Sequence, residues 1–277
     1  MDFVKYLVLA FLQGATEFIP VSSSGHLVFF QRIFGFEQPL VFFDIVLHLA
    51  TMLSVIMFLR KELLLIAQES IMAIKNLCTG KRWHKVWQEF SYFRLGLFVF
   101  IAIIPAVLAG IVLADFIEKM FSSLKVVGVS FLITGTVLFW TKYVSSKRQM
   151  KTFNFLDAFL IGIFQAVALF PGISRSGMTI SAGIFRGLDK KNAARFSFIL
   201  SVPTIFAAAV YKLTTQIEEI QIDIILLSLF FMVSFLSGYL ALTILSRMIS
   251  QAKFYYFSYY CWGIGIISLG LGFLGYV

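Results

Sequence analysis

Eight long apolar segments account for most of this chain and constrain its fold more than any other feature. The chain has 277 residues, of which 60% are hydrophobic and 13% are charged, whereas a soluble domain averages about 45–50% apolar and about 25% charged residues. This apolar excess excludes a soluble globule and a disordered or collagen-like chain. We therefore predict an all-α polytopic membrane protein. The segments cover approximately residues 6–31, 41–59, 95–114, 126–141, 155–185, 196–211, 224–246 and 254–277.

Six of the eight segments match single membrane spans, for which about 20 apolar residues are needed. The first and the fifth segments instead contain polar residues near their middle. Segment 6–31 includes Glu17 and Pro20, and segment 155–185 includes Pro171. Proline and glycine interrupt a membrane helix, and the interrupted backbone must lie within protein or a water-filled cavity. We predict that both segments are broken helices.

The distribution of Lys and Arg indicates how the broken segments run. If both enter the membrane and return, 17 Lys and Arg residues lie on one side and 5 on the other, whereas if both cross, the split is 13 to 9. Both counts omit Arg175, which lies within segment 155–185. Because cytoplasmic loops are enriched in Lys and Arg, we predict two re-entrant hairpins, six spans and both termini outside. The net charge of +9 then reflects topology rather than binding to nucleic acid.

The two broken segments are also related by an internal repeat. A glutamine, a phenylalanine and a Ser-x-Ser-Gly sequence recur at an offset of 152 residues, as in Gln13 and Gln165. Each half has one hairpin and three spans, an odd number, so the second half is inverted. We predict a single integral membrane domain over residues 1–277, with repeat 1 at about 1–141 and repeat 2 at about 152–277. Such repeats place a binding site near the midplane, where they meet.

Residues that could carry chemistry cluster at the two helix breaks. The first break has Glu17 and His26, and the second has Arg175. The serine-rich stretch after each break is expected to begin a helix, and helix N-termini bind phosphate through backbone N–H groups and the helix dipole. The guanidinium of Arg175 is a planar fork that matches phosphate oxygens. Because phosphoryl transfer needs positioning, charge stabilisation and an activated oxygen nucleophile, the pattern predicts a phosphoryl-transfer site.

Other interpretations of these residues stay open at this stage. Serine in membrane helices often serves packing alone, Glu17 and Arg175 could form a structural ion pair, and His26 could be a helix residue with satisfied hydrogen bonds. Asp44 and His48 lie four residues apart, which fits a supporting or capping role as well as a direct one. A transporter or lipid flippase would also use inverted repeats and broken helices. An accessible carboxylate, imidazole and hydroxyl in one motif favours catalysis.

Two motifs in these segments resemble the signatures of a known family. Residues 13–26, QGATEFIPVSSSGH, are similar to the first signature of bacterial undecaprenyl-diphosphatases, the bacitracin-resistance family. Residues 171–179, PGISRSGMT, are similar to the second signature, and the similarity extends through most of the chain. A partial match to the acid-phosphatase-like lipid phosphatases fails, because Ser181 stands where that family has a histidine.

The resemblance implies hydrolysis of undecaprenyl diphosphate to undecaprenyl phosphate outside the bacterial cytoplasmic membrane, which recycles the lipid carrier of peptidoglycan synthesis. It also implies inverted repeats with two re-entrant hairpins, and assistance by a divalent cation, Mg²⁺ or Ca²⁺. Gln13 stands where the family pattern also allows a glutamate. Glu17 is then the one carboxylate of the motif and the expected metal ligand. The sequence leaves the oligomeric state open, a homodimer included.

We predict that the diphosphate enters between the hairpin tips from the outer face, and that its prenyl chain lies between spans. Ser23 is the preferred nucleophile, with His26 orienting it or serving as acid; His26 as nucleophile and direct attack by water are the alternatives. Glu17 acts as base or metal ligand. The predicted catalytic residues are Glu17, Ser23, His26 and Arg175, and the predicted diphosphate-binding residues are Gln13, Ser22, Ser24, Gly172, Ser174, Ser176, Gly177 and Thr179.

Overall fold

The computed structural model describes residues 3–36, 40–121, 123–215, 223–249 and 254–275. In this part of the chain the regular structure is helical, and the one extended pairing is an isolated bridge between Arg148 and Leu188. The helices are α1 (Phe3–Glu17), α2 (Ser23–Ile33), α3 (Val41–Phe58), α4 (Arg60–Cys78), α5 (Trp83–Glu89), α6 (Ser91–Val112), α7 (Ala114–Met120), α8 (Leu124–Trp140), η1 (Thr141–Tyr143), η2 (Met150–Thr152), α9 (Phe155–Val167), α10 (Arg175–Phe185), α11 (Lys190–Thr215), α12 (Ile224–Met248), η3 (Phe254–Tyr256) and α13 (Phe257–Phe273).

Among the described residues, five helical stretches are long and apolar enough to cross a membrane. They are α3, α6, α8 together with η1, α11 and α12. Each coincides with a predicted span, so the prediction of an all-helical polytopic membrane protein is confirmed. The sixth predicted span, 254–277, contains η3 and α13, and α13 has 17 residues.

Both predicted helix breaks are present. Helix α1 ends six residues before α2 begins, α9 ends eight residues before α10 begins, and in each pair the two helices pack against each other. Gly172, in the second break, has φ of 89°, a left-handed backbone that glycine adopts without steric cost. Ser22, in the first break, has φ of 67° without being a glycine. Strained residues of this kind cluster at functional sites, and Ser22 stands directly before α2.

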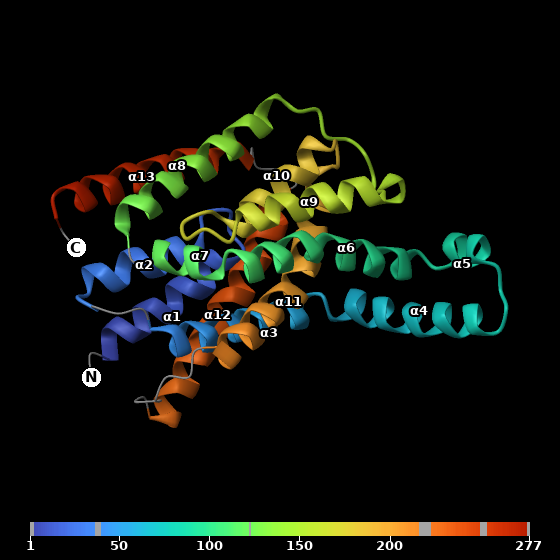
Figure 1. Ribbon diagram of the computed structural model, residues 1–277, viewed down its shortest axis with the longest axis horizontal. Helices are drawn as coiled ribbons and strands as arrows, with labels where there is room; N and C mark the ends of the chain where they lie inside the picture. Colours follow the sequence, from blue (N-terminus) through green and yellow to red (C-terminus); the bar gives the residue numbers. More distant parts are fainter. Residues whose placement is uncertain (1–2, 37–39, 122, 216–222, 250–253, 276–277) are drawn as a thin grey trace.

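Neighbouring helices cover the two broken segments. Helix α1 packs against α3 and α12, and α9 packs against α6 and α10. Helices α8 and α13 pack along each other at one edge of the molecule (Figure 1). Phe18 and Val21 of the first break lie in the same hydrophobic cluster as Ile180 and Ile184 of α10. The interrupted backbone is therefore surrounded by protein, as a membrane environment requires.

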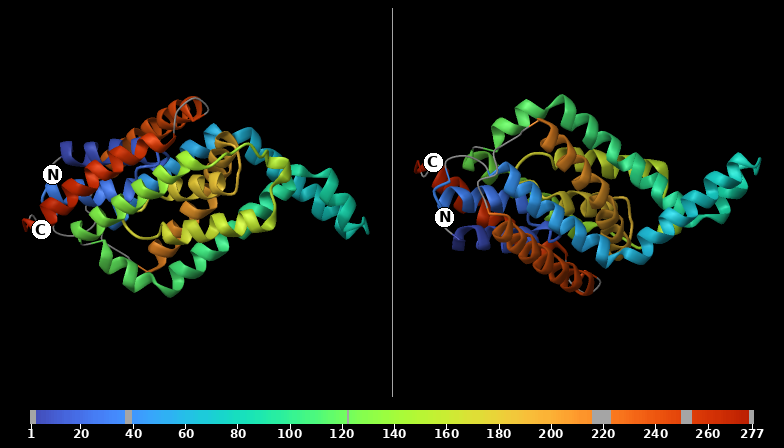
Figure 2. Two further views of the ribbon diagram at one scale, coloured as in Figure 1. Left: turned by 90° about the horizontal axis from the view of Figure 1, so that it is seen from above. Right: turned by 90° about the horizontal axis from the view of Figure 1, so that it is seen from below.

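Helices α4 and α5 form an arm that projects from the rest of the molecule (Figures 1 and 2). The beginning of α1 and the end of α13 lie at the opposite end of the molecule (Figures 1 and 2). The arm combines basic residues with exposed apolar ones such as Leu64, Ile71 and Trp83. This combination suits a membrane surface, and the sequence predicts an interfacial location for segment 63–91.

A buried carboxylate, Asp157, ties the start of α9 to the corner between α10 and α11. Its side chain is fully buried and accepts hydrogen bonds from Arg148 Nη2 at 2.9 Å and Arg186 Nε at 2.6 Å. Burial raises the pKa of Asp157, but the hydrogen bonds from Arg148 and Arg186 outweigh burial and hold that pKa below its ordinary value. Arg148 also donates its backbone N–H to Gly187 O at 2.8 Å, so this cluster fixes the segment that leads into α9.

Arg148→Ala is expected to lower the thermal stability of the protein strongly. Asp157 would then be a buried carboxylate with one of its two cations removed, and such a loss destabilises a protein by about 3–5 kcal/mol. Thermal unfolding in a mild detergent measures the effect. Lys147→Ala is the matched control, because Lys147 is the adjacent cation and its side chain is exposed. Equal melting temperatures for the two variants would contradict the role assigned to Asp157.

Candidate functional site

The two Ser-x-Ser-Gly sequences adopt the same local structure, as N-caps of α2 and α10. Ser22 Oγ accepts a hydrogen bond from Gly25 N at 3.2 Å, and Ser174 Oγ accepts one from Gly177 N at 3.0 Å. In both cases the capping hydroxyl lies close to that of the serine two residues later, at 3.3 Å and 3.2 Å. Serine is a preferred N-cap, and the first backbone N–H groups of each helix have no partner within it. Two helix N-termini therefore form where predicted.

The two helix breaks touch each other. Gly172 N donates to Ser24 Oγ at 3.5 Å, and Ser176 Oγ donates to Ile19 O at 3.2 Å. A Cβ atom added to Gly25 would lie 2.9 Å from Gly172 Cα. Gly25 is thus required by the close approach of the two breaks, whereas a Cβ atom on Gly172 would lie 2.8 Å from Val127 O and from Ser130 Cβ of α8. The breaks bring together motifs that lie about 150 residues apart in sequence.

Glu17 lies at the centre of the contact and receives hydrogen bonds from both motifs. Its Oε1 accepts a hydrogen bond from Arg175 Nη2 at 2.5 Å, and its Oε2 accepts one from Ser23 Oγ at 2.5 Å. Gln13 Nε2 donates to the same Oε2 at 2.9 Å. The structure therefore brings Glu17, Ser23 and Arg175, three of the four predicted catalytic residues, into direct contact.

The exposure of these residues follows a pattern that suits a reaction site. The side chain of Glu17 is 5% exposed and that of Arg175 is 14% exposed. Ser23 and Ser24 are partly exposed, whereas the flanking Ser22 is buried. The carboxylate is thus enclosed by protein, while a hydroxyl and a guanidinium beside it remain within reach of a ligand. In such an enclosed setting the charges interact more strongly than in water.

His48 is a member of this cluster that the sequence motifs do not include. Its Nε2 lies 3.8 Å from Glu17 Oε2, the oxygen that also accepts from Ser23. Its Nδ1 lies 2.6 Å from Asp44 O, and because a carbonyl oxygen only accepts, Nδ1 carries a proton. Nε2 faces Glu17. The spacing of Asp44 and His48 indicated a shared helical face, but only packing of α3 against α1 places His48 here.

His26 has different partners from those predicted. Its Nδ1 lies 2.7 Å from Ser22 O, and its Nε2 lies 2.6 Å from the hydroxyl of Tyr260 on α13. The His26 ring also stacks on Tyr260, with centroids 5.7 Å apart, and it is buried. Since the Ser22 carbonyl requires a proton on Nδ1, neutral His26 accepts from Tyr260 at Nε2. Both ring nitrogens are therefore engaged away from Ser23 in this arrangement. No sequence signal identified Tyr260.

Two further predicted residues, Thr179 and Gln13, are buried beside the site. Thr179 is buried, and its hydroxyl lies 2.6 Å from Ser197 Oγ on α11, so it joins α10 to α11. Gln13 is fully buried, and its Oε1 has no hydrogen-bond partner among the described residues. An unpartnered buried acceptor is costly, so this oxygen is available to a donor brought by a ligand.

The donor set near Glu17 does not fit a divalent cation held by protein side chains alone. Mg²⁺ and Ca²⁺ are bound by several oxygen ligands, usually with more than one carboxylate in an all-protein site. Here both Glu17 oxygens already accept hydrogen bonds, and one of them is paired with the Arg175 cation. The described residues contain no cluster of three or more His, Cys, Asp or Glu side chains suited to a metal ion.

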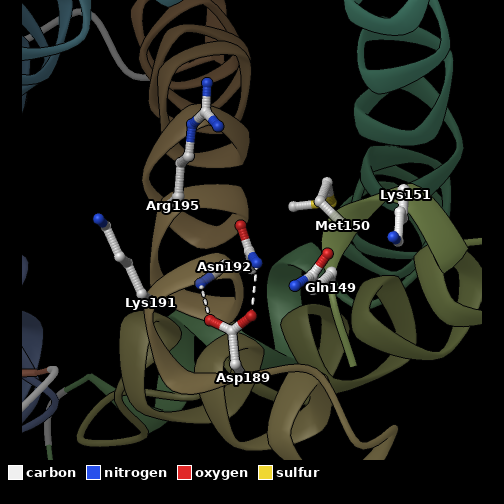
Figure 3. A pocket seen from close by; sticks show the side chains of 7 residues that line it. All are labelled: Gln149, Met150, Lys151, Asp189, Lys191, Asn192 and Arg195. Atoms are coloured by element: carbon white, nitrogen blue, oxygen red, sulfur yellow. Dashed lines mark hydrogen bonds between the residues drawn. The ribbon is translucent and has the colours of Figure 1, made fainter. Parts of the chain in front are cut away.

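A separate hollow lies between η2 and the first two turns of α11 (Figure 3). Its volume is about 430 Å³, and none of the predicted site residues lines it. Lys191 and Arg195 on α11 line one side, and Lys151 of η2 lies on the other (Figure 3). This hollow is therefore distinct from the cluster around Glu17.

Comparison with known proteins identifies the family to which this site belongs. The family model of the bacitracin resistance protein BacA matches residues 6–267. The chain belongs to this family. It is 40% identical over 274 residues to the undecaprenyl-diphosphatase of Alkaliphilus metalliredigens, covering 97% of this chain and 98% of that protein. It is 37% identical over 276 residues to the undecaprenyl-diphosphatase of Desulforapulum autotrophicum, covering 99% of this chain and 100% of that protein. The family resemblance of the two motifs is thereby confirmed.

Proposed function

We propose that this chain hydrolyses undecaprenyl diphosphate to undecaprenyl phosphate and phosphate at the outer face of the bacterial cytoplasmic membrane. The observation that carries the proposal is the contact of both motifs on one buried carboxylate, where Ser23 and Arg175 bind the two oxygens of Glu17. The names of relatives that match nearly the whole chain point to the same reaction. Its product is the lipid carrier used in peptidoglycan synthesis.

The geometry supports a mechanism in which Ser23 is the nucleophile. Glu17 Oε2 takes the hydroxyl proton, and Ser23 Oγ forms a bond to the terminal phosphorus. The bond from that phosphorus to the bridging oxygen breaks, and undecaprenyl phosphate leaves with the electron pair. Water then hydrolyses the phosphoserine, which releases phosphate and restores the hydroxyl. Arg175 and the N–H groups at the starts of α2 and α10 bind the phosphate oxygens.

Two alternatives to Ser23 as the nucleophile require additional changes in the site. His26 as nucleophile would have to release Tyr260 from its Nε2. Direct attack by water needs a water molecule in line with the bridging oxygen, with Glu17 as base. Because Ser23 Oγ already donates to Glu17 at 2.5 Å, it needs the least rearrangement of the three.

We propose a membrane arrangement in which the two inverted repeats meet at the site around Glu17. In this proposal 1–277 is one domain, α1–α2 and α9–α10 are re-entrant hairpins, and both termini lie outside. Three observations support it: the matching N-caps of α2 and α10, the contact between the breaks, and the position of the beginning of α1 and the end of α13 opposite the basic α4–α5 arm (Figure 1). A site between inverted repeats lies near the membrane midplane.

Mg²⁺ or Ca²⁺ stays a proposed cofactor of the reaction. Since the residues around Glu17 do not form a cation site of their own, we place the cation with the substrate, as a counter-ion of the diphosphate. No step above depends on it.

Phosphate release from undecaprenyl diphosphate by the purified protein tests the proposed function. We expect saturable release by the wild type, measured with and without a chelator. A strong loss with the chelator, restored by Mg²⁺ or Ca²⁺, would support the cation. Reconstituted protein that moves the lipid across vesicles without releasing phosphate would replace the phosphatase by a transporter or flippase.

A further inference from the structure

The hollow between η2 and α11 is lined by three cationic side chains that the proposed reaction does not use. They are Lys151, Lys191 and Arg195, which line a hollow of about 430 Å³ together with four other residues (Figure 3). None of them contacts the cluster around Glu17 in the interactions described above. A strongly basic hollow of this kind requires an explanation other than catalysis.

Among the residues that the structure describes, the acidic residue in the hollow, Asp189, forms no ion pair with these three cations. Asp189 Oδ1 accepts from Asn192 N at 2.9 Å, and Asp189 Oδ2 accepts from Asn192 Nδ2 at 2.5 Å. Both oxygens are therefore used at the first turn of α11, as Figure 3 shows. Within the described part of the chain, neither Lys151 nor Lys191 has an ion-pair partner. The hollow thus keeps an excess of positive charge.

Arg195, the third cation of the hollow, is held in place by residues of two other helices. Its Nε is buried and has no hydrogen-bond partner among the described residues. The same guanidinium is already oriented by Tyr92 Oη, 3.5 Å from Nη2, and by Glu62 Oε1, 3.7 Å from Nη2. The Arg195 side chain is 32% exposed, and a phosphate oxygen is a partner that guanidinium groups bind well.

The position of the hollow at the end of a membrane-spanning helix favours a lipid headgroup as the source of that phosphate. It lies at the first two turns of α11, one of the helices long enough to cross a membrane, and therefore at one end of a span. Tyr92 contacts Arg195 there. The ring of Trp87 packs against the ring of Phe155 at the start of α9, with ring centroids 5.3 Å apart. Tyr and Trp are enriched at the membrane–water interface, and basic pockets beside membrane helices bind anionic headgroups.

We propose that this hollow binds the phosphate of an anionic phospholipid headgroup. Lys151 and Lys191 attract the headgroup, and the partly exposed guanidinium of Arg195 donates to a phosphate oxygen. The bound lipid would hold η2 against the start of α11, next to the cluster of Arg148, Arg186 and Asp157. The proposal is independent of the proposed function, because it concerns lipid binding and uses no residue of the Glu17 site.

Thermal unfolding of delipidated protein in a neutral detergent, titrated with phosphatidylglycerol or phosphatidylcholine, tests the proposal. We expect phosphatidylglycerol to raise the melting temperature saturably, and phosphatidylcholine to have little effect. The double variant Lys151→Gln/Lys191→Gln should weaken the phosphatidylglycerol response roughly 30-fold, since each lysine contributes roughly fivefold. The matched control is Lys75→Gln/Lys85→Gln, which removes the same charge from exposed positions of the α4–α5 arm and should keep the wild-type response.

Three results would overturn this assignment. Equal responses to the two lipids would remove the requirement for an anionic headgroup. An equal loss in both double variants would show attraction by overall charge without a specific site. Inorganic phosphate that stabilises the wild type as effectively as phosphatidylglycerol would assign the hollow to free phosphate.

Discussion

Arg175→Ala is expected to reduce phosphate release from undecaprenyl diphosphate by roughly 10³-fold. Arginines that stabilise the charge of a transferring phosphoryl group contribute about this much or more. Arg175 also pairs with Glu17 at 2.5 Å, so its removal leaves the carboxylate without its cation. Arg175→Lys should recover only part of the rate, because lysine keeps the charge but not the planar fork. Steady-state kinetics on purified variants separate kcat from KM.

The control for this prediction is Arg60→Ala, which removes an exposed arginine at the start of α4. We expect it to retain wild-type kinetics. Wild-type phosphate release by a folded Arg175→Ala protein would exclude the assigned role and leave the Glu17–Arg175 pair as a structural contact.

Ser23→Ala should reduce hydrolysis far more strongly than Ser24→Ala. Ser23 Oγ is the hydroxyl that donates to Glu17, at 2.5 Å. Ser24 Oγ instead lies near Ser22 Oγ and accepts from Gly172 N at 3.5 Å, so its loss weakens the contact between the breaks. We expect a decrease of roughly 10³-fold or more for Ser23→Ala, typical of losing a nucleophile, and one of roughly tenfold for Ser24→Ala. Ser24→Ala is therefore the matched control, one residue away.

Trapping the intermediate identifies the nucleophile directly. Rapid quenching followed by mass spectrometry should find phosphate on Ser23. Phosphate on His26, or substantial turnover by Ser23→Ala, would transfer the role to His26 or to water.

Features that depend on neighbouring residues were predictable from the sequence. The positions of both helix breaks follow from Pro20, Pro171 and the glycine that follows Pro171, because proline and glycine act on the backbone locally. The N-caps follow in the same way, since Ser22 and Ser174 need only the N–H three residues later. Five of the six predicted spans coincide with helices of spanning length because apolar composition over about 20 residues determines a membrane helix.

The buried cluster at Asp157, in contrast, was not predictable from the sequence. Nothing in the two motifs identifies Asp157, and its partners Arg148 and Arg186 are two of the 17 Lys and Arg residues whose distribution predicts membrane sidedness. Both pair with one carboxylate because the segment before α9 folds against the corner between α10 and α11. Residues that serve topology in the sequence can therefore also hold the fold together.

The amino-acid sequence was sufficient to predict a helical membrane protein with two broken segments, and its motifs identified the family and the residues at the breaks. Which of those residues meet depends on tertiary packing. Ser23 is bound by Glu17, whereas His26 is bound by Tyr260, 234 residues away, and His48 joins Glu17 from outside both motifs. The physical reason is that helix breaks and caps depend on backbone geometry within a few residues, whereas contacts between side chains depend on how α1, α3, α10 and α13 pack.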